Sequence, residues 1–110
     1  MTTPRVSVLV PYRDCGPTLP EALAGLCADP DPARELIVIN DGSRDDGPAF
    51  VTDLARRDPR VIALHTPGLG IVGALAVGLA HACGDLLARM DADDVCDPAR
   101  IARQRHHLDA

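Results

Sequence analysis

Three carboxylates lie close together near the end of the sequence, where Asp91, Asp93 and Asp94 are interrupted only by Ala92. Carboxylates at this spacing repel one another unless a cation lies among them. Ligand sets made only of oxygen favour Mg²⁺ or Mn²⁺ over zinc, and an ion held in this way neutralises the charge on a leaving diphosphate. The cluster therefore predicts a divalent metal site, and a solvated acidic turn that caps a helix is the alternative interpretation.

The absence of lysine from the sequence removes several other kinds of chemistry. No residue can serve as the phosphate-binding lysine of a P-loop, as a Schiff-base lysine or as the lysine of a phospho-acceptor receiver domain. The net charge of -5 and the absence of a basic run with interleaved aromatic residues also exclude a nucleic acid as partner.

The cysteines bear on the cellular compartment. Cys15, Cys27, Cys83 and Cys96 have none of the close spacings of a zinc site. We expect free thiols in a reducing compartment, which favours the cytoplasm. No apolar stretch reaches about 18 residues and the N-terminus runs straight into a strand-like segment, so the sequence predicts neither a membrane span nor a signal peptide.

The elements that must position the chemical residues alternate between short apolar segments and helical patterns. Buried strands are expected at residues 6–10, 36–39, 61–64 and 86–90. Helices are expected from a cap at Thr18 to Leu26, from a cap at Asp46 to Arg57, over residues 71–83, and from Asp97 onward. This order predicts a single α/β domain over residues 1–110, a three-layer α/β/α sandwich with a mainly parallel sheet of about four strands.

Polar side chains follow three of the four expected strands. Asp14 comes after the first strand, Asn40 and Asp41 come directly after the second, and the aspartate cluster follows the fourth. Ligands of parallel α/β sheets bind at the carboxyl ends of the strands. We therefore expect these side chains to belong to one binding site.

Three motifs in this order resemble the family 2 glycosyltransferases of the GT-A fold, and the resemblance spans nearly the whole chain. The motifs are Val6-Ser7-Val8-Leu9-Val10-Pro11, then Leu36-Ile37-Val38-Ile39-Asn40-Asp41-Gly42-Ser43-Arg44-Asp45, then Arg89-Met90-Asp91-Ala92-Asp93-Asp94 with Pro98 shortly after. The resemblance implies the Rossmann-like, nucleotide-sugar-binding half of such an enzyme. It implies transfer of a sugar from a nucleoside-diphosphate sugar, with the UDP type favoured, to an acceptor hydroxyl with the help of a divalent metal.

The resemblance also implies roles for particular residues. Asp41 matches the family aspartate at the nucleobase, Asp91 and Asp93 match the D-x-D acids at the ribose and the metal, and Asp94 extends that cluster. The residues expected to bind the nucleotide sugar are Pro11, Tyr12, Arg13, Asp14, Asn40, Asp41, Asp91 and Ala92, and those expected to bind the metal are Asp93, Asp91 and Asp94.

The sequence departs from the family pattern at several positions. The family commonly has a small residue, an aromatic and an asparagine where this chain has Tyr12, Arg13 and Asp14, so Arg13 is expected to stack on the base in place of the aromatic. Asn40 stands where a first aspartate is usual, which keeps a hydrogen-bonding group without its charge. Leu75 and Ala76 replace a common Arg-Asn pair, which removes a diphosphate contact.

The family domain normally continues for about as many residues again, with the acceptor site and the general base. We therefore expect the acceptor half to be absent, assign no catalytic base and expect the chain to be inactive alone if it is truncated. A non-catalytic nucleotide-binding or interaction module is the alternative. The open edge of the last strand also predicts self-association of the chain.

A third alternative is a NAD-binding Rossmann domain. Residues 68–73 read G-x-G-x-x-G, and Asp91 follows about 20 residues later. Against this alternative, Thr66 and Pro67 separate the strand from the first glycine, whereas the dinucleotide fingerprint places glycine at the tight turn that follows the strand.

Overall fold

A computed structural model of the chain describes residues 6–28 and 34–90. Helices and strands alternate along the chain, as expected. In order they are β1 (Val6–Tyr12), α1 (Leu19–Cys27), β2 (Arg34–Asp41), α2 (Gly47–Arg57), β3 (Val61–Thr66), α3 (Gly70–His81) and β4 (Leu86–Arg89). The longest helix has 12 residues, and no helix among the described residues is long and apolar enough to span a bilayer.

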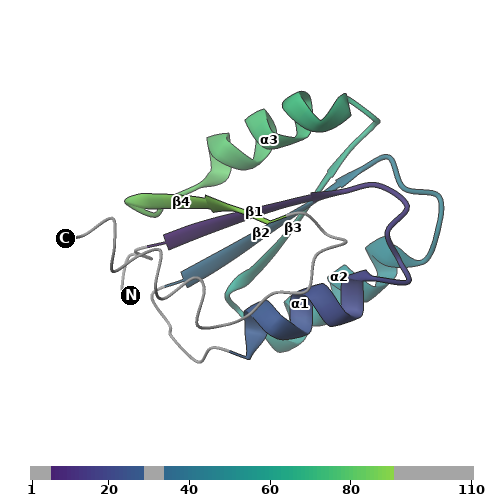
Figure 1. Cartoon of the computed structure of the whole chain (residues 1–110), viewed down its shortest axis with the longest axis horizontal. Coiled ribbons are helices and arrows are strands. Elements are labelled where there is room, and N and C mark those ends of the chain that lie inside the picture. Colours follow the sequence, from purple (N-terminus) through teal and green to yellow (C-terminus); the bar gives the residue numbers. More distant parts are fainter. Residues whose placement is uncertain (1–5, 29–33, 91–110) are drawn as a thin grey trace.

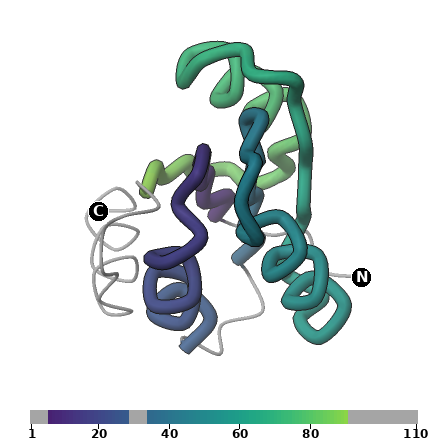
Figure 2. The backbone as a smooth tube through the Cα atoms, turned by 90° about the vertical axis from the view of Figure 1, so that its right-hand side faces the viewer, coloured from purple at the N-terminus to yellow at the C-terminus, as the bar shows by residue number. Residues whose placement is uncertain are grey.

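The four strands form one parallel sheet in the order β3-β2-β1-β4. Helix α3 covers one face of the sheet, and α1 and α2 cover the other (Figure 1). Figure 2, turned by 90°, shows the same three layers, with α3 on one side of the strands and the other two helices opposite. The predicted three-layer sandwich with a parallel sheet is thus confirmed.

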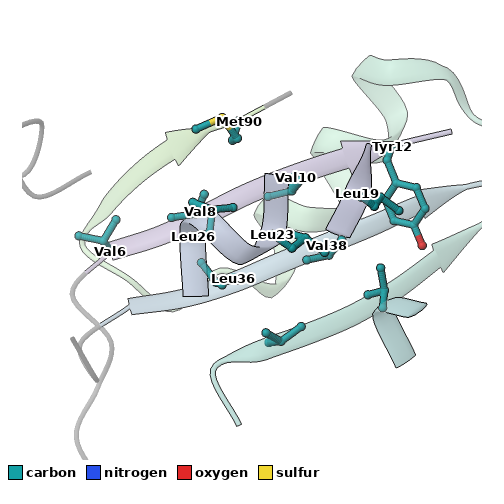
Figure 3. Packing of buried hydrophobic residues seen from close by; sticks show 12 residues of the cluster. Val6, Val8, Val10, Tyr12, Leu19, Leu23, Leu26, Leu36, Val38 and Met90 are labelled. Atoms are coloured by element: carbon teal, nitrogen blue, oxygen red, sulfur yellow. The ribbon is translucent and has the colours of Figure 1, made fainter. Parts of the chain in front are cut away.

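The core is divided by the sheet, because successive side chains of a strand point to opposite faces. Val8, Val10, Leu36 and Val38 pack under α1 and α2 (Figure 3), whereas the alternate residues of the same strands pack under α3. These side chains are almost fully buried, and each contributes about 1.5–3 kcal/mol relative to an exposed side chain. The two central strands, β1 and β2, are buried along their entire length.

The first strand continues beyond the expected stop at Pro11 and ends at Tyr12. The reason is the direction in which a backbone N–H at position 11, which proline lacks, would point. The amide of Met90 donates to the carbonyl of Leu9 at 3.0 Å, so odd-numbered residues of β1 direct their backbone groups toward β4. Since β4 pairs only as far as Leu9, Pro11 removes no hydrogen bond of the ladder.

A buried polar network closes the amino-terminal edge of the sheet. The Ser7 hydroxyl donates to Glu35 Oε2 at 2.5 Å, and the amides of Cys83 and Gly84 donate to Glu35 Oε2 and Ser7 Oγ at 2.7 and 2.8 Å. A Cβ on Gly84 would lie 2.7 Å from the Ser7 nitrogen, so only glycine fits there. The network joins β1, β2 and the loop that leads into β4.

Candidate nucleotide site at the carboxyl edge of the sheet

Asp41 lies at the carboxyl end of β2 on the face covered by α3, and its carboxylate is held by three donors. Asp41 Oδ1 accepts from the Thr66 hydroxyl at 2.5 Å and from the Leu69 amide at 2.6 Å, and Oδ2 accepts from the Gly70 amide at 2.9 Å. These bonds hold the pKa of Asp41 below its ordinary value, the Thr66 hydrogen bond contributing most, and they outweigh the desolvation that opposes ionisation. The positive charge of Arg13 acts in the same direction.

Glycines allow this close approach of β2 to the start of α3. Gly42 has φ of +82°, and a Cβ on it would lie 3.1 Å from the Gly68 nitrogen. Gly68 and Gly70 also have positive φ, at 98° and 82°. The amides at the N-terminus of α3, which a dinucleotide fold would use for a pyrophosphate, are therefore occupied by an internal carboxylate.

Asn40 lies on the opposite face of β2, and both ends of its amide are used. Asn40 Oδ1 accepts from the Ser43 amide at 2.8 Å, so the NH₂ group faces His65 Nδ1 at 3.2 Å. A backbone N–H can only donate, which fixes the assignment of the amide. His65 Nδ1 is then the acceptor, and neutral His65 carries its proton on Nε2. Asn40 thus ties the loop after β2 to the end of β3.

The loops that follow β1 and β2 are joined by reciprocal hydrogen bonds, which we call the Asp14–Asp45 latch. The Asp14 amide donates to Ser43 Oγ at 3.0 Å, and Asp14 Oδ1 accepts from the Arg44 amide at 2.7 Å. Asp45 Oδ2 accepts from the Gly16 amide at 2.9 Å, and its Oδ1 caps the start of α2 through the Gly47 amide at 2.9 Å. The latch fixes the part of the chain that carries Arg13.

The four expected site residues at the end of β1 have different environments. Pro11 and Tyr12 are buried, and the Tyr12 ring packs in the core (Figure 3), where burial raises the pKa of its hydroxyl. The Tyr12 hydroxyl has no hydrogen-bond partner among the described residues. Arg13 and Asp14 are exposed, and Asp14 has a positive φ of 53°. Of the four, Arg13 is the side chain that is both exposed and electrostatically coupled to Asp41.

The aspartate cluster of Asp91, Ala92, Asp93 and Asp94 lies outside the described residues. Strand β4 ends at Arg89, and Met90 is the last described residue before the cluster. Within residues 6–28 and 34–90, no group of three or more histidines, cysteines or acids could hold a metal ion. Leu75, at one of the positions that lack the usual Arg-Asn pair, packs against the core under α3.

Comparison with known proteins decides the family. The sequence profile of Glycosyl transferase family 2 matches residues 7–110. The chain belongs to this family. An uncharacterized glycosyltransferase of Haemophilus influenzae is 33% identical over 91% of the chain and 31% of the relative. An undecaprenyl-phosphate 4-deoxy-4-formamido-L-arabinose transferase of Sodalis glossinidius is 33% identical over 94% of the chain and 34% of the relative.

Solved structures share the fold of this chain. The mannosyltransferase PcManGT of Pyrobaculum calidifontis, in complex with GDP-Man and Mn²⁺, matches with a TM-score of 0.75 and 28% identity over 84% of this chain and 28% of that one. S. aureus TarS in complex with UDP-GlcNAc matches with a TM-score of 0.81 over 96% of this chain and 31% of that one, and its 21% identity supports the fold alone. This family 2 glycosyltransferase chain spans about a third of the length of the curated relatives cited above.

Sequence reasoning missed three residues that build the site, namely Thr66, Asp45 and His65. In the sequence, Thr66 stands out only as a separator between the strand and the first glycine. Thr66 could have been identified as a polar β-branched residue at the end of a strand. In the parallel register it lies directly opposite Asp41. Asp45 could have been found from its position two residues before the helix that begins at Gly47.

Proposed function

We propose that this glycosyltransferase chain forms the nucleotide-sugar-binding half of an enzyme that transfers a sugar from a nucleoside-diphosphate sugar to an acceptor hydroxyl. The UDP type of donor is favoured. The observation that carries the proposal is the Asp41 carboxylate, which is buried, ionised and held at the carboxyl end of β2. The acceptor half and the general base belong to a part of the enzyme that we place outside residues 1–110.

Each candidate residue has a distinct role in this proposal. Asp41 accepts a hydrogen bond from the edge of the nucleobase, and the exposed Arg13 guanidinium stacks on its face. Pro11 lies next to the last residue of β1 and is placed beside the base in this proposal. Tyr12, Asp14 and Asn40 act through the backbone conformation that they impose, because their side chains are occupied in the core, in the latch and by His65.

The aspartate cluster supplies the metal site in this proposal. Asp93, with Asp91 and Asp94, would hold Mg²⁺ or Mn²⁺, and Asp91 and Ala92 would lie beside the ribose. A donor set made only of carboxylates fits these hard cations. When bound, such an ion neutralises the charge that develops on the diphosphate. The GDP-Man and Mn²⁺ complex of PcManGT supports a divalent metal and a nucleotide-sugar donor.

The cytoplasmic location is part of the same proposal and rests on the cysteines. Cys15, Cys27 and Cys83 are free in the described structure. Free thiols are typical of a reducing compartment.

Isothermal titration tests the donor site. We expect UDP, GDP or dTDP to bind the purified chain more tightly with Mn²⁺ than without it, and we expect D93A to lose the metal-dependent part. No metal-dependent binding to any of the three would overturn the proposal. NAD serves as the control ligand, and we expect no binding because Asp41 already occupies the amides of Leu69 and Gly70.

A non-catalytic nucleotide-binding module is the second candidate. It is favoured by the loss of the Arg-Asn pair at Leu75 and Ala76. Donor hydrolysis separates the two functions. Release of sugar from a UDP-sugar that is lost in D93A supports the enzyme, whereas tight binding without turnover supports the module.

A further inference from the structure

The Thr66 hydroxyl can donate only one hydrogen bond, and distance decides where it goes. Its oxygen lies 2.5 Å from Asp41 Oδ1 and 3.4 Å from the Asn40 carbonyl oxygen. The shorter contact is to a carboxylate, which accepts more strongly than a neutral carbonyl. The proton therefore lies between Thr66 and Asp41. Both residues are buried, with exposed fractions of 9% and 5%, so water competes little for this bond.

The remaining acceptor capacity of Asp41 lies mainly on Oδ2. A carboxylate has about four lone-pair positions. Oδ1 already accepts from Thr66 and Leu69, whereas Oδ2 accepts from Gly70 alone. Oδ2 therefore retains the capacity to accept one further hydrogen bond without displacing a bond of the protein.

The class of that donor follows from the charge of Asp41. An ionised carboxylate is an acceptor only. Uracil, thymine and guanine carry an imino N–H on the edge by which they pair, whereas cytosine and adenine present a lone pair at the corresponding ring nitrogen. A fixed carboxylate thus attracts the first group and repels the second, and a site built on such a hydrogen bond discriminates strongly against a base that lacks the donor.

We propose that Thr66 is a positioning residue for base recognition, whose hydroxyl orients the Asp41 carboxylate so that Oδ2 accepts a hydrogen bond from the imino N–H of uracil, thymine or guanine. This inference rests on the proposed function, which places the nucleobase at Asp41. It adds the residue that orients this carboxylate toward the base. Thr66 suits this role because its β-branched side chain has few rotamers at the end of β3.

The test compares nucleotides that differ in the imino group. Calorimetry with Mn²⁺ measures the dissociation constants of UDP and CDP, with GDP and ADP as a second pair. The wild-type chain should prefer UDP to CDP or GDP to ADP. Thr66→Val keeps the branched shape and removes the hydroxyl, so it should weaken the preferred nucleotide about tenfold, equivalent to about 1.4 kcal/mol. Binding of CDP or ADP should change little, because these bases do not use Asp41.

Two further variants separate positioning from a general structural role. Thr66→Ser keeps the hydroxyl and should restore the preference for the imino base. Thr52→Val makes the same chemical change in the middle of α2 and should leave all four dissociation constants unaltered. Circular dichroism of each variant checks that it folds, and N3-methyl-UDP gives a second measurement on the wild-type chain, which should bind it no better than CDP.

The outcomes distinguish this inference from the proposed function. A folded wild-type chain that binds none of the four nucleotides overturns both. A wild-type chain that prefers UDP, combined with a Thr66→Val variant that keeps the same preference, overturns the positioning role of Thr66 alone. Equal wild-type binding of UDP, CDP and N3-methyl-UDP, together with equal binding of GDP and ADP, overturns the base class and leaves nucleotide binding standing.

Discussion

At the scale of single residues, side chains at the carboxyl edge of the sheet already form hydrogen bonds within the protein before any ligand binds. Asp41 illustrates this most clearly, since two strands and the start of a helix meet at its carboxylate. A carboxylate with this many donors is strongly oriented, and such preorganisation reduces the cost of ordering when a ligand binds. The same bonds make Asp41 important for stability as well as for recognition.

The pH dependence of stability follows from the lowered pKa of Asp41. Because the pKa is lower in the folded chain than its ordinary value of 3.8, ionised Asp41 stabilises the fold above that value. This contribution is lost as the pH falls through the folded pKa. Thr66→Val removes the main cause of the lowering, so its acid unfolding midpoint should move to higher pH. Far-UV circular dichroism between pH 2 and 6 measures the midpoint, and an unchanged midpoint would contradict the prediction.

Gly42 should be more sensitive to substitution than Gly68, although both have positive φ. Alanine at either position costs about 1–2 kcal/mol because of the backbone conformation. A Cβ at Gly42 also meets the backbone of Gly68, whereas a Cβ at Gly68 has no atom within 4 Å. Gly42→Ala should therefore lower the free energy of unfolding more than Gly68→Ala, as measured by urea denaturation. Equal losses of unfolding free energy in the two variants would contradict this prediction, because they would show that the loop around Gly42 moves to accept the added Cβ.

At the scale of elements, the loops after β1 and β2 behave as one unit because of the Asp14–Asp45 latch. Each loop supplies both donors and acceptors to the other. The helices that follow these loops start at the carboxyl edge, so the latch also fixes where α1 and α2 begin. Arg13 lies inside this unit, so the hydrogen bonds of its neighbours Asp14 and Gly16 help to set the position of its backbone.

Asp45 should contribute more to stability than its neighbour Asp46. The sequence predicted Asp46 as the cap of the helix, and Asp46 does occupy the cap position, but its side chain makes no capping hydrogen bond. Asp45 instead accepts from the amides of Gly16 and Gly47. Asp45→Ala should lower the free energy of unfolding by about 1–2 kcal/mol, and Asp46→Ala by about 0.5 kcal/mol or less. Urea denaturation of both variants measures the difference, and the reverse order would refute the latch.

At the scale of the whole molecule, apolar side chains are exposed around α3 and β4. Val72 and Leu79 on α3 are 79% and 51% exposed, and Leu87 on β4 is 48% exposed. Strand β4 lies at one end of the four-stranded sheet. Unpaired strand edges and exposed apolar patches are typical places for association.

Self-association through the β4 edge remains a prediction. Light scattering at high concentration should give a mass above that of the monomer, and Leu87→Lys should lower it, because charged residues on edge strands oppose pairing. Val72→Lys is the matched control on α3. A strictly monomeric wild-type chain would refute association, and a larger effect of Val72→Lys would move the interface to the helix.

The sequence predicted the order of the elements well, because their apolar patterns are set by burial on one or two faces of the sheet. Strand ends were less predictable. Strand β2 begins and ends with buried polar residues, namely Arg34, Glu35, Asn40 and Asp41. They can be buried because their side chains form hydrogen bonds with distant partners. Contacts such as Thr66 to Asp41 depend on the register between strands, which local pattern does not contain.

The location of β1 inside the sheet affects how the chain can fold while it is being synthesised. Strand β1 pairs with β2 on one side and with β4 on the other, and Val6 is opposite Leu86. On the ribosome, β1, β2 and β3 therefore emerge well before β1 acquires its second neighbour. During that interval the backbone groups of β1 that face β4 are unpaired, and Ser7 and Glu35 lack their partners from the loop at Gly84. This unpaired edge of β1 is the part of the nascent chain that a chaperone would most need to protect.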